Sequence, residues 1–151
     1  MAELAAAEGI LVIREPFHDD GVSGALLRES DQTMIIVNAA NAPVRQRFTI
    51  AHEIGHFNLH RGAVYLDGRA RINFRDGLSA MATDQEEIDA NAFAAALLMA
   101  AGWVRAAFET VVRNSAINSE DELAEVLAAR FGVSRQAMLF RLINLGLVAS
   151  P

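Results

Sequence analysis

Two histidines with a glutamate between them form the segment of this sequence best suited to chemistry. In His52-Glu53-Ile54-Gly55-His56 the histidines are four positions apart, so on a helix both imidazoles project from one face and can bind one cation. Glu53 follows His52 directly, where its carboxylate can act on the water that a metal activates without being a ligand itself. The pattern therefore predicts a zinc site with His52 and His56 as ligands and Glu53 as the general base.

The remaining ligand must be a histidine or a carboxylate, because the sequence contains no cysteine. A catalytic zinc site needs a third protein ligand and an open fourth position. The metzincin extension of the motif would place glycine at position 59 and histidine at position 62. The chain has Leu59 and Gly62 instead, so this extension is absent and the third ligand lies further along the chain.

A cluster of acids downstream offers the third ligand, and Glu87 is the preferred candidate. Asn91 follows Glu87 at helical spacing and can hydrogen-bond to a ligand histidine from behind. Glu86 is better explained as the acid of a capping box, and Asp89 lies roughly 200° from Glu87 on the helical wheel. Glu86 and Asp89 remain the alternatives to Glu87.

Other polar residues are weaker candidates for a role in the predicted zinc site. His60 stands four positions after His56, but a straight helix advances about 12 Å from position 52 to position 60, so three histidines on it cannot surround one ion. We expect His60 to support a ligand histidine or to lie at the helix end, and His18 to be a surface histidine. Candidate oxyanion donors, none of them preferred, are Tyr65, Arg45, Arg47, Arg71 and Arg75.

The first part of the chain has the pattern of a small sheet. Residues 2–7 favour a short helix and residues 10–13 a buried strand. The strand-like runs 23–29 and 33–38 are separated by a short polar step, which is typical of an antiparallel hairpin. Strand 23–29 is expected at the edge of the sheet, where an extended substrate can pair with it.

Helical spacing over residues 44–60 places the two histidines on a helix. Asn41 is the candidate N-cap of this helix and Pro43 falls in its first turn. The following residues 65–76 are expected to form a loop that can include a strand, because apolar and polar residues alternate near its end.

Further helices are expected in the second half of the chain. Residues 84–101 favour a long helix that Thr83 caps and Gly102 ends. A C-terminal helical pair is predicted at about residues 119–146, with Ser119 and Ser134 as its N-caps. The elements together predict an α+β fold, in which an antiparallel-rich sheet packs on the histidine-bearing helix and on a second helix that bears the third ligand.

Composition narrows the class of protein. The 151 residues have a formal net charge of -6, and 52% of them are apolar. This length and apolar content predict a single domain over residues 1–151. The negative charge argues against direct binding to nucleic acid. The longest apolar run, residues 92–104, is shorter than the roughly 20 residues of a membrane helix, so we expect a cytoplasmic protein without a membrane anchor.

Four segments carry a resemblance to a known family: residues 45–56 (RQRFTIAHEIGH), 87–99 (EIDANAFAAALLM), 131–134 (FGVS) and 141–142 (RL). The first resembles the active-site helix of the ImmA/IrrE-type metallopeptidases, and the likeness extends over most of the chain. It implies a zincin-like fold and a bacterial or phage protease that cuts a partner repressor of the helix-turn-helix class. Ala100 departs from the family, which usually has proline there, and this leaves the end of the second long helix open.

The resemblance does not decide which metal is bound or whether the protein cuts its partner. Zinc is expected, although two imidazoles and one carboxylate also suit manganese or iron. One alternative function is a regulator that binds a repressor through the same fold without cutting it. A less favoured alternative is a DNA-binding regulator that uses the C-terminal helical pair, whose second helix offers only Arg135 and Arg141 to phosphates.

Overall fold

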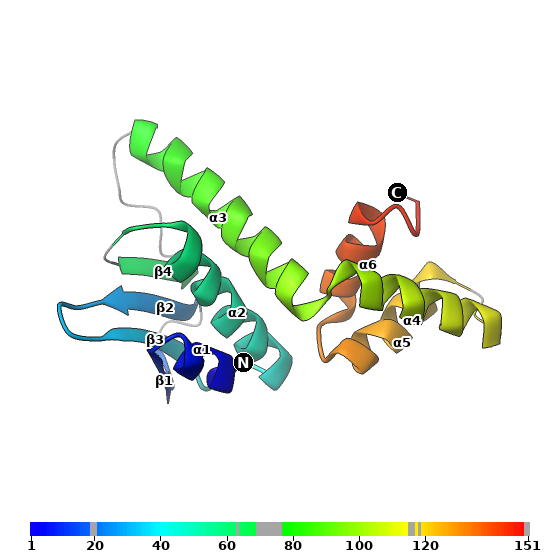
Figure 1. The fold of residues 1–151 in the computed structure, drawn as a ribbon, viewed down its shortest axis with the longest axis horizontal. Coiled ribbons are helices and arrows are strands. Elements are labelled where there is room, and N and C mark those ends of the chain that lie inside the picture. Colours follow the sequence, from blue (N-terminus) through cyan, green and yellow to red (C-terminus); the bar gives the residue numbers. More distant parts are fainter. Residues whose placement is uncertain (19–20, 63, 69–76, 115–116, 118, 150–151) are drawn as a thin grey trace. The chain divides into compact units, whose positions relative to one another are not determined.

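The computed structural model describes residues 1–18, 21–62, 64–68, 77–114, 117 and 119–149. The chain divides into two compact units, Met1–Ala94 and Ala95–Pro151. The first unit contains a four-stranded sheet and the second is helical among its described residues, so the predicted α+β class is confirmed (Figure 1). The single domain expected over residues 1–151 stays a prediction.

The sheet of the first unit has the strand order β1-β3-β2-β4. The strands are β1 (Ile10–Glu15), β2 (Val22–Arg28), β3 (Thr33–Asn38) and β4 (Val64–Gly68). Strands β2 and β3 form the predicted antiparallel hairpin, β4 pairs antiparallel with β2, and β1 pairs parallel with β3. The sheet is therefore mixed, with two antiparallel pairings and one parallel pairing.

Strand β2 lies inside the sheet, so the prediction that residues 23–29 form its edge is wrong. The strand pairs with β3 on one side and with β4 on the other, and a sequence pattern does not reveal the second pairing because it joins distant segments. Among the described residues, β4 is the edge strand on this side of the sheet. The predicted alternation at the end of residues 65–76 lies outside the described residues.

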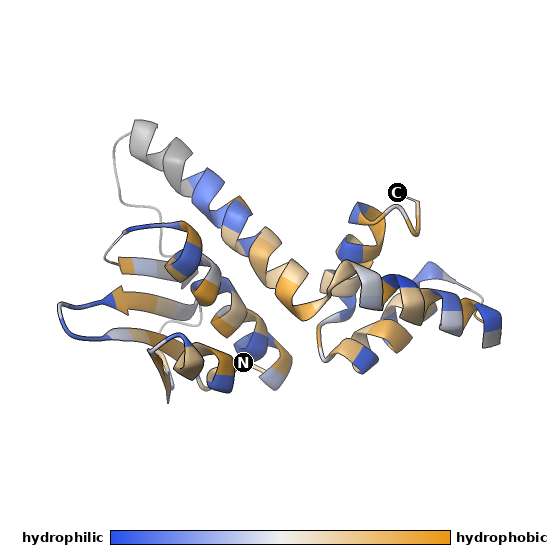
Figure 2. Ribbon diagram, in the orientation of Figure 1, coloured by the Kyte–Doolittle hydropathy of each residue, from blue (hydrophilic) through white to orange (hydrophobic). Residues whose placement is uncertain are grey.

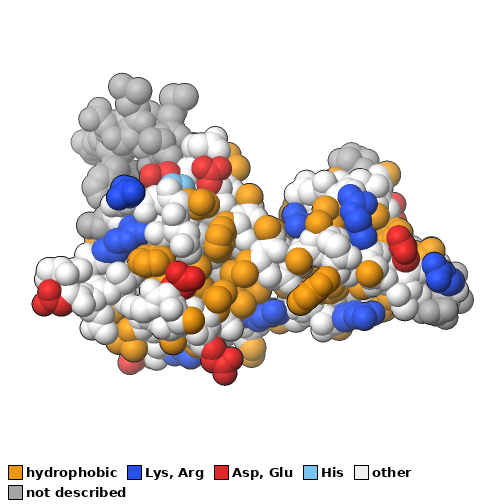
Figure 3. Space-filling model, in the orientation of Figure 1, with side chains coloured by type: hydrophobic (Ala, Val, Ile, Leu, Met, Phe, Trp, Pro, Cys, Tyr) orange, Lys and Arg blue, Asp and Glu red, His pale blue; other side chains and the backbone are white. Residues whose placement is uncertain are grey.

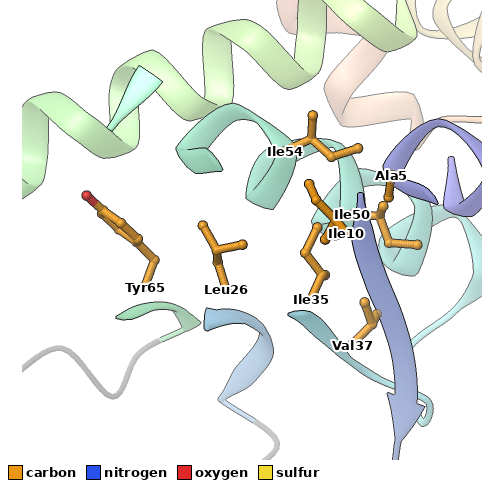
Figure 4. Packing of buried hydrophobic residues seen from close by; sticks show 8 residues of the cluster. All are labelled: Ala5, Ile10, Leu26, Ile35, Val37, Ile50, Ile54 and Tyr65. Carbon is orange, nitrogen blue, oxygen red and sulfur yellow. The ribbon is translucent and has the colours of Figure 1, made fainter. Parts of the chain in front are cut away.

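Helices α1 (Ala2–Ala7) and α2 (Pro43–Leu59) pack with the sheet around one apolar cluster. The buried side chains of this cluster come from the sheet and from both helices, as Figure 4 shows: Ala5, Ile10, Leu26, Ile35, Val37, Ile50, Ile54 and Tyr65. Ile50 and Ile54 are 1% exposed and lie four residues apart on α2. Their burial fixes which face of α2 turns towards the sheet.

The start of α2 differs from the prediction. Pro43 occupies the first turn as expected, but the N-cap is Ala42 and no side chain caps the helix. Asn41 is therefore not the N-cap. The Gln46 side chain instead donates to the carbonyl oxygens of Asn41 and Ala39, which ties the helix to the preceding turn.

Helix α3 (Gly77–Leu98) begins before the predicted cap and ends before the predicted stop. Thr83 lies inside α3, so it is not an N-cap, and Glu86 is not the acid of a capping box. The chain leaves the helix at Met99 and Ala100 although no proline stands there, and α4 (Ala101–Asn114) follows at once. Gly102 lies in the first turn of α4, where glycine does not end a helix.

The C-terminal helical pair has the predicted caps. Helix α5 (Glu120–Phe131) begins after Ser119, whose Oγ accepts from the Glu122 amide, and α6 (Arg135–Asn144) begins after Ser134, whose Oγ accepts from the Ala137 amide. Between the two helices, Gly132 has a φ of 61°, a left-handed conformation that glycine adopts without strain.

No single helix among the described residues combines the length and apolar character needed to cross a membrane. The segments Asp84–Leu98 and Ala101–Arg113 meet both criteria only when they are counted together as a bent pair.

The contact of β2 with α2 predicts a cost for any side chain at Gly24. A Cβ there would overlap the Thr49 methyl group and lie 2.9 Å from the Ile36 carbonyl oxygen. Gly24→Ala should therefore lower the free energy of unfolding by about 1–3 kcal/mol, measured by thermal unfolding. The matched control is Gly102→Ala, where a Cβ meets nothing within 4 Å. The control should be neutral or stabilising, and equal stabilities of the two variants would contradict the predicted contact.

Candidate metal centre

Helix α2 brings the two predicted ligand histidines together in the interior of the first unit. His52 and His56 are 2% and 0% exposed. Their spacing of four residues places both rings on one face of α2, and the two Nε2 atoms lie 3.0 Å apart. Both imidazoles thus present the same ring nitrogen to one point.

Glu87 of α3 completes the group. Its Oε2 lies 3.3 Å from His52 Nε2 and its Oε1 lies 2.8 Å from His56 Nε2. Ligand atoms that surround a tetrahedral zinc ion at its usual bond lengths are roughly 3.3 Å apart. The nitrogen and oxygen atoms of His52, His56 and Glu87 have nearly this separation, so the group could hold a metal ion, and its donor types suit zinc.

A close contact between α2 and α3 allows Glu87 to reach the histidines. A Cβ at Gly55 would lie 3.1 Å from Ala90 Cα and 3.2 Å from the Ala90 carbonyl oxygen, so the two helices nearly touch at this point. Ala90 is fully buried. Because Gly55 is next to His56 and Ala90 is one turn after Glu87, this contact sets the distance between the ligand groups.

Each histidine has a polar partner on its other ring nitrogen. Asn91 Oδ1 lies 3.2 Å from His52 Nδ1, and His60 Nδ1 lies 3.1 Å from His56 Nδ1. Ligand histidines in metal sites usually donate this second N–H to a carboxylate, a carbonyl or another acceptor, which fixes the orientation of the ring. The structure therefore brings together with Glu87 the four other side chains that the sequence predicted for the site: His52, His56, Asn91 and His60.

The neighbouring acids of α3 have partners of their own. Glu86 Oε1 accepts a long hydrogen bond of 3.5 Å from the Tyr65 hydroxyl, and Asp89 Oδ2 lies 3.9 Å from His60 Nε2. Only Glu87 of the three candidate acids lies against both histidines. Figure 2 shows that the described part of α3 is polar around these acids and becomes apolar towards Leu98.

Glu53 and His18 occupy contrasting environments. Glu53 is 0% exposed and lies on α2 immediately after His52. Its role as general base stays a prediction. His18 is exposed, so the prediction of a surface histidine is confirmed.

Residues 5–143 match the family model described as the IrrE N-terminal-like domain, a peptidase family. The chain belongs to this family. The match covers far more than half of the chain and agrees with the resemblance to the ImmA/IrrE-type metallopeptidases. No match was found among curated proteins.

Arg28 is a residue of this IrrE-like site that the sequence analysis missed. From the end of β2 its guanidinium donates to four carbonyl oxygens around the end of α2: His56 (3.0 Å), Phe57 (2.9 Å), His60 (2.9 Å) and Gly62. Carbonyl groups at a helix C-terminus lack helical partners, and a positive charge there complements the helix dipole. No local pattern signals this role, because the partners follow Arg28 by 28 to 34 residues.

Tyr65 of β4 packs directly on the candidate metal centre of this IrrE-like domain. Its ring stacks on the His56 ring with a centroid distance of 4.3 Å and an interplanar angle of 20°. Its hydroxyl accepts from the Gly62 amide at 2.9 Å, so this candidate oxyanion donor already has partners. Arg45 likewise donates to Ser23 Oγ, and Arg71 and Arg75 lie outside the described residues.

Burial lowers the pKa of His56 below its ordinary value of 6.5, and charge on His52 and His60 lowers it further. Glu87 raises the pKa of His56 through its hydrogen bond and its charge, but the net shift of the pKa is downward. The imidazole of His56 therefore stays neutral, which is the form that binds a metal, at lower pH than a free histidine does.

Removal of the Glu87 carboxylate should weaken metal binding. We expect Glu87→Gln to reduce the affinity for Zn²⁺ by more than the roughly 10- to 100-fold that loss of an outer partner costs. Chelator competition measures this affinity. Glu86→Gln is the matched control, because its carboxylate faces Tyr65 and its loss should leave the affinity nearly unchanged. A larger effect at position 86 than at position 87 would reverse the assignment.

The lowered pKa of His56 predicts how the stability of the metal-free protein depends on pH. Between pH 6.5 and the lower folded-state pKa, the unfolded chain binds a proton at this histidine while the folded protein does not. The free energy of unfolding contributed by His56 should therefore fall as the pH drops from 6.5 towards the folded-state pKa, and should be constant above this window. Urea unfolding at several pH values measures the slope. His56→Gln should reduce it, and an unchanged slope would refute the prediction.

Proposed function

We propose that this protein is a zinc-dependent endopeptidase that cuts a partner repressor of the helix-turn-helix class in the cytoplasm. The observation that carries the proposal is the convergence of two imidazole nitrogens and one carboxylate on a single point beside a buried glutamate. The peptidase family of the chain supports the same reaction. The choice of a repressor as substrate is supported by the resemblance to ImmA/IrrE-type enzymes.

The residues of the site are suited to peptide hydrolysis. A zinc ion bound by His52, His56 and Glu87 would polarise the scissile carbonyl and make water acidic enough to attack at neutral pH. Glu53 takes a proton from the attacking water on its carboxylate and passes it to the leaving amine nitrogen. The burial of Glu53 strengthens these charge interactions, because the interior of a protein screens charges less than water does.

The number of ligands favours a catalytic site over a structural one. Structural zinc sites are closed by four protein ligands, whereas catalytic sites have three and leave one position open. Within the part of the chain that the structure describes, the group of candidate ligands consists of His52, His56 and Glu87. This donor set leaves a position for water or for the substrate carbonyl.

Strand β4 provides a surface for an extended peptide. Its Tyr65 stacks on His56, and its neighbour Val64 is 57% exposed. Among the described strands, β4 pairs with β2, and we expect an extended peptide to add main-chain hydrogen bonds at the other edge of β4. A protein segment that adds to this edge would pass close to the metal centre.

The second unit favours a protein partner over DNA. Arg135 of α6 pairs with Asp121, and Arg141 donates to the Met99 carbonyl oxygen, so both guanidinium groups of α6 have partners within the chain. On the face of this unit that Figure 3 shows, arginines lie among apolar and acidic side chains. Phosphate binding requires a continuous basic surface, and the face drawn in Figure 3 has no such surface among the described residues.

The role of Glu53 can be tested by one substitution. Glu53→Gln should bind Zn²⁺ as well as the wild-type protein does, because Glu53 is not a ligand. It should cut the proposed repressor substrate at least roughly 10²-fold more slowly, because an amide takes up no proton. Fragments are identified by their intact masses. A Glu53→Gln protein that cuts at the wild-type rate would refute the role.

Matched controls separate cleavage from binding alone. Glu3→Gln makes the same chemical change at an exposed position and should leave cleavage unchanged. His52→Ala should lose both zinc and cleavage. If the zinc-loaded wild-type protein binds the repressor and yields no fragments, the function is sequestration of the repressor and not proteolysis.

A further inference from the structure

Asp89 and His60 extend the metal centre towards the surface of the first unit. His60 Nδ1 lies 3.1 Å from His56 Nδ1, and His60 Nε2 lies 3.9 Å from Asp89 Oδ2. We propose that His60, oriented by Asp89, is a positioning residue that holds His56 in the ring orientation and tautomer that bind the metal. This inference rests on the proposed metal site. It adds to the site a row of side chains in contact, from Asp89 through His60 to His56.

The proton positions follow from the two facing ring nitrogens. Two Nδ1 atoms at this distance share one hydrogen, so one ring donates and the other accepts. When His56 Nε2 is a ligand, its hydrogen must be on Nδ1, and His56 is the donor. His60 then accepts at Nδ1 and carries its own hydrogen on Nε2, which faces the negative charge of Asp89.

His60 is not itself a ligand in this arrangement. It approaches His56 at Nδ1, whereas Glu87 approaches His56 at Nε2. These two nitrogens lie on opposite sides of an imidazole ring, so the ring of His56 separates His60 from the point where the ligand atoms converge. His60 therefore acts on the metal only through His56.

The backbone and the packing hold His60 in place. It is the C-cap residue of α2, its carbonyl oxygen accepts from Arg28 at 2.9 Å, and its side chain is 8% exposed. The same guanidinium binds the His56 carbonyl oxygen, so one side chain fixes the backbone of both histidines. The His60 ring thus has little freedom to turn away from His56.

Asp89 contributes by its charge more than by a direct hydrogen bond. The distance of 3.9 Å to His60 Nε2 is an ion-pair distance, and the Asp89 side chain is 47% exposed, so water screens part of the interaction. Gln85 Nε2 donates to Asp89 Oδ1 at 2.9 Å and leaves Oδ2 directed at His60. The effect of Asp89 should therefore be smaller than that of His60.

The test compares substitutions that keep or remove the acceptor at the position of His60 Nδ1. In His60→Asn the side-chain oxygen stands close to where Nδ1 was, whereas His60→Leu has similar volume and no acceptor. We expect His60→Leu to bind Zn²⁺ roughly 10- to 100-fold more weakly than the wild-type protein, and His60→Asn to recover most of the affinity. Asp89→Asn should lose less than His60→Leu. Asp84→Asn, the same charge change at an exposed position of α3, should lose nothing.

Zinc affinity is measured by chelator competition with the full-length protein and zinc alone. In addition, ¹⁵N spectra of the zinc-loaded wild-type protein should show His60 with a bare Nδ1 and a protonated Nε2, a signature that does not depend on any variant. The proposal is overturned if His60 has the opposite tautomer, or if His60→Leu binds zinc as tightly as His60→Asn. A wild-type protein that binds no zinc refutes the metal site itself, and a protein that binds zinc but cuts nothing refutes only the peptidase function.

Discussion

The contact of Gly55 with Ala90 is the constraint on which the geometry of the candidate metal centre depends. Any side chain at position 55 would push against the backbone of α3, since even a Cβ would lie 3.1 Å from Ala90 Cα. Glycine inside a helix costs about 0.5–1 kcal/mol relative to alanine, so its presence between His52 and His56 indicates that close approach matters more here than helix stability. Glu87, one turn before Ala90, reaches both imidazoles as a direct result.

The close approach of α2 and α3 also places polar side chains in the interior, where the loss of their hydration costs free energy. His52, Glu53 and His56 are at most 2% exposed and lie on the same stretch of α2 as the core residues Ile50 and Ile54. Buried ionisable groups destabilise a fold unless partners offset their loss of hydration. Glu87, Asn91 and His60 provide such partners for the histidines. A fold selected for stability alone would fill these positions with apolar side chains, so the cost indicates a functional site.

Patterns among neighbouring residues predicted most helices and strands, including α2 with His52 and His56. The pairings that these patterns missed join residues far apart in the sequence. The hairpin, the serine caps of α5 and α6 and the spacing of His52 and His56 depend on neighbouring residues, and all three are found in the structure. The parallel pairing of β1 with β3 and the pairing of β4 with β2 join segments far apart in sequence. The predictions that Thr83 caps a helix and that Gly102 ends it were wrong for a different reason, because residue types that cap or end helices also occur inside them.

The identity of residue 53 bears on the choice between cleavage and simple binding. A protein that only captures a repressor would need the fold and the surface of β4, but not a carboxylate buried beside the ligand histidines. Burying a carboxylate costs several kcal/mol before its partners are counted, whereas glutamine or leucine at the same place would avoid the charge. Glu53 is nonetheless fully buried on α2, next to His52. The proton transfer proposed for Glu53 would account for the stability that this residue costs, whereas capture alone requires no carboxylate at this place.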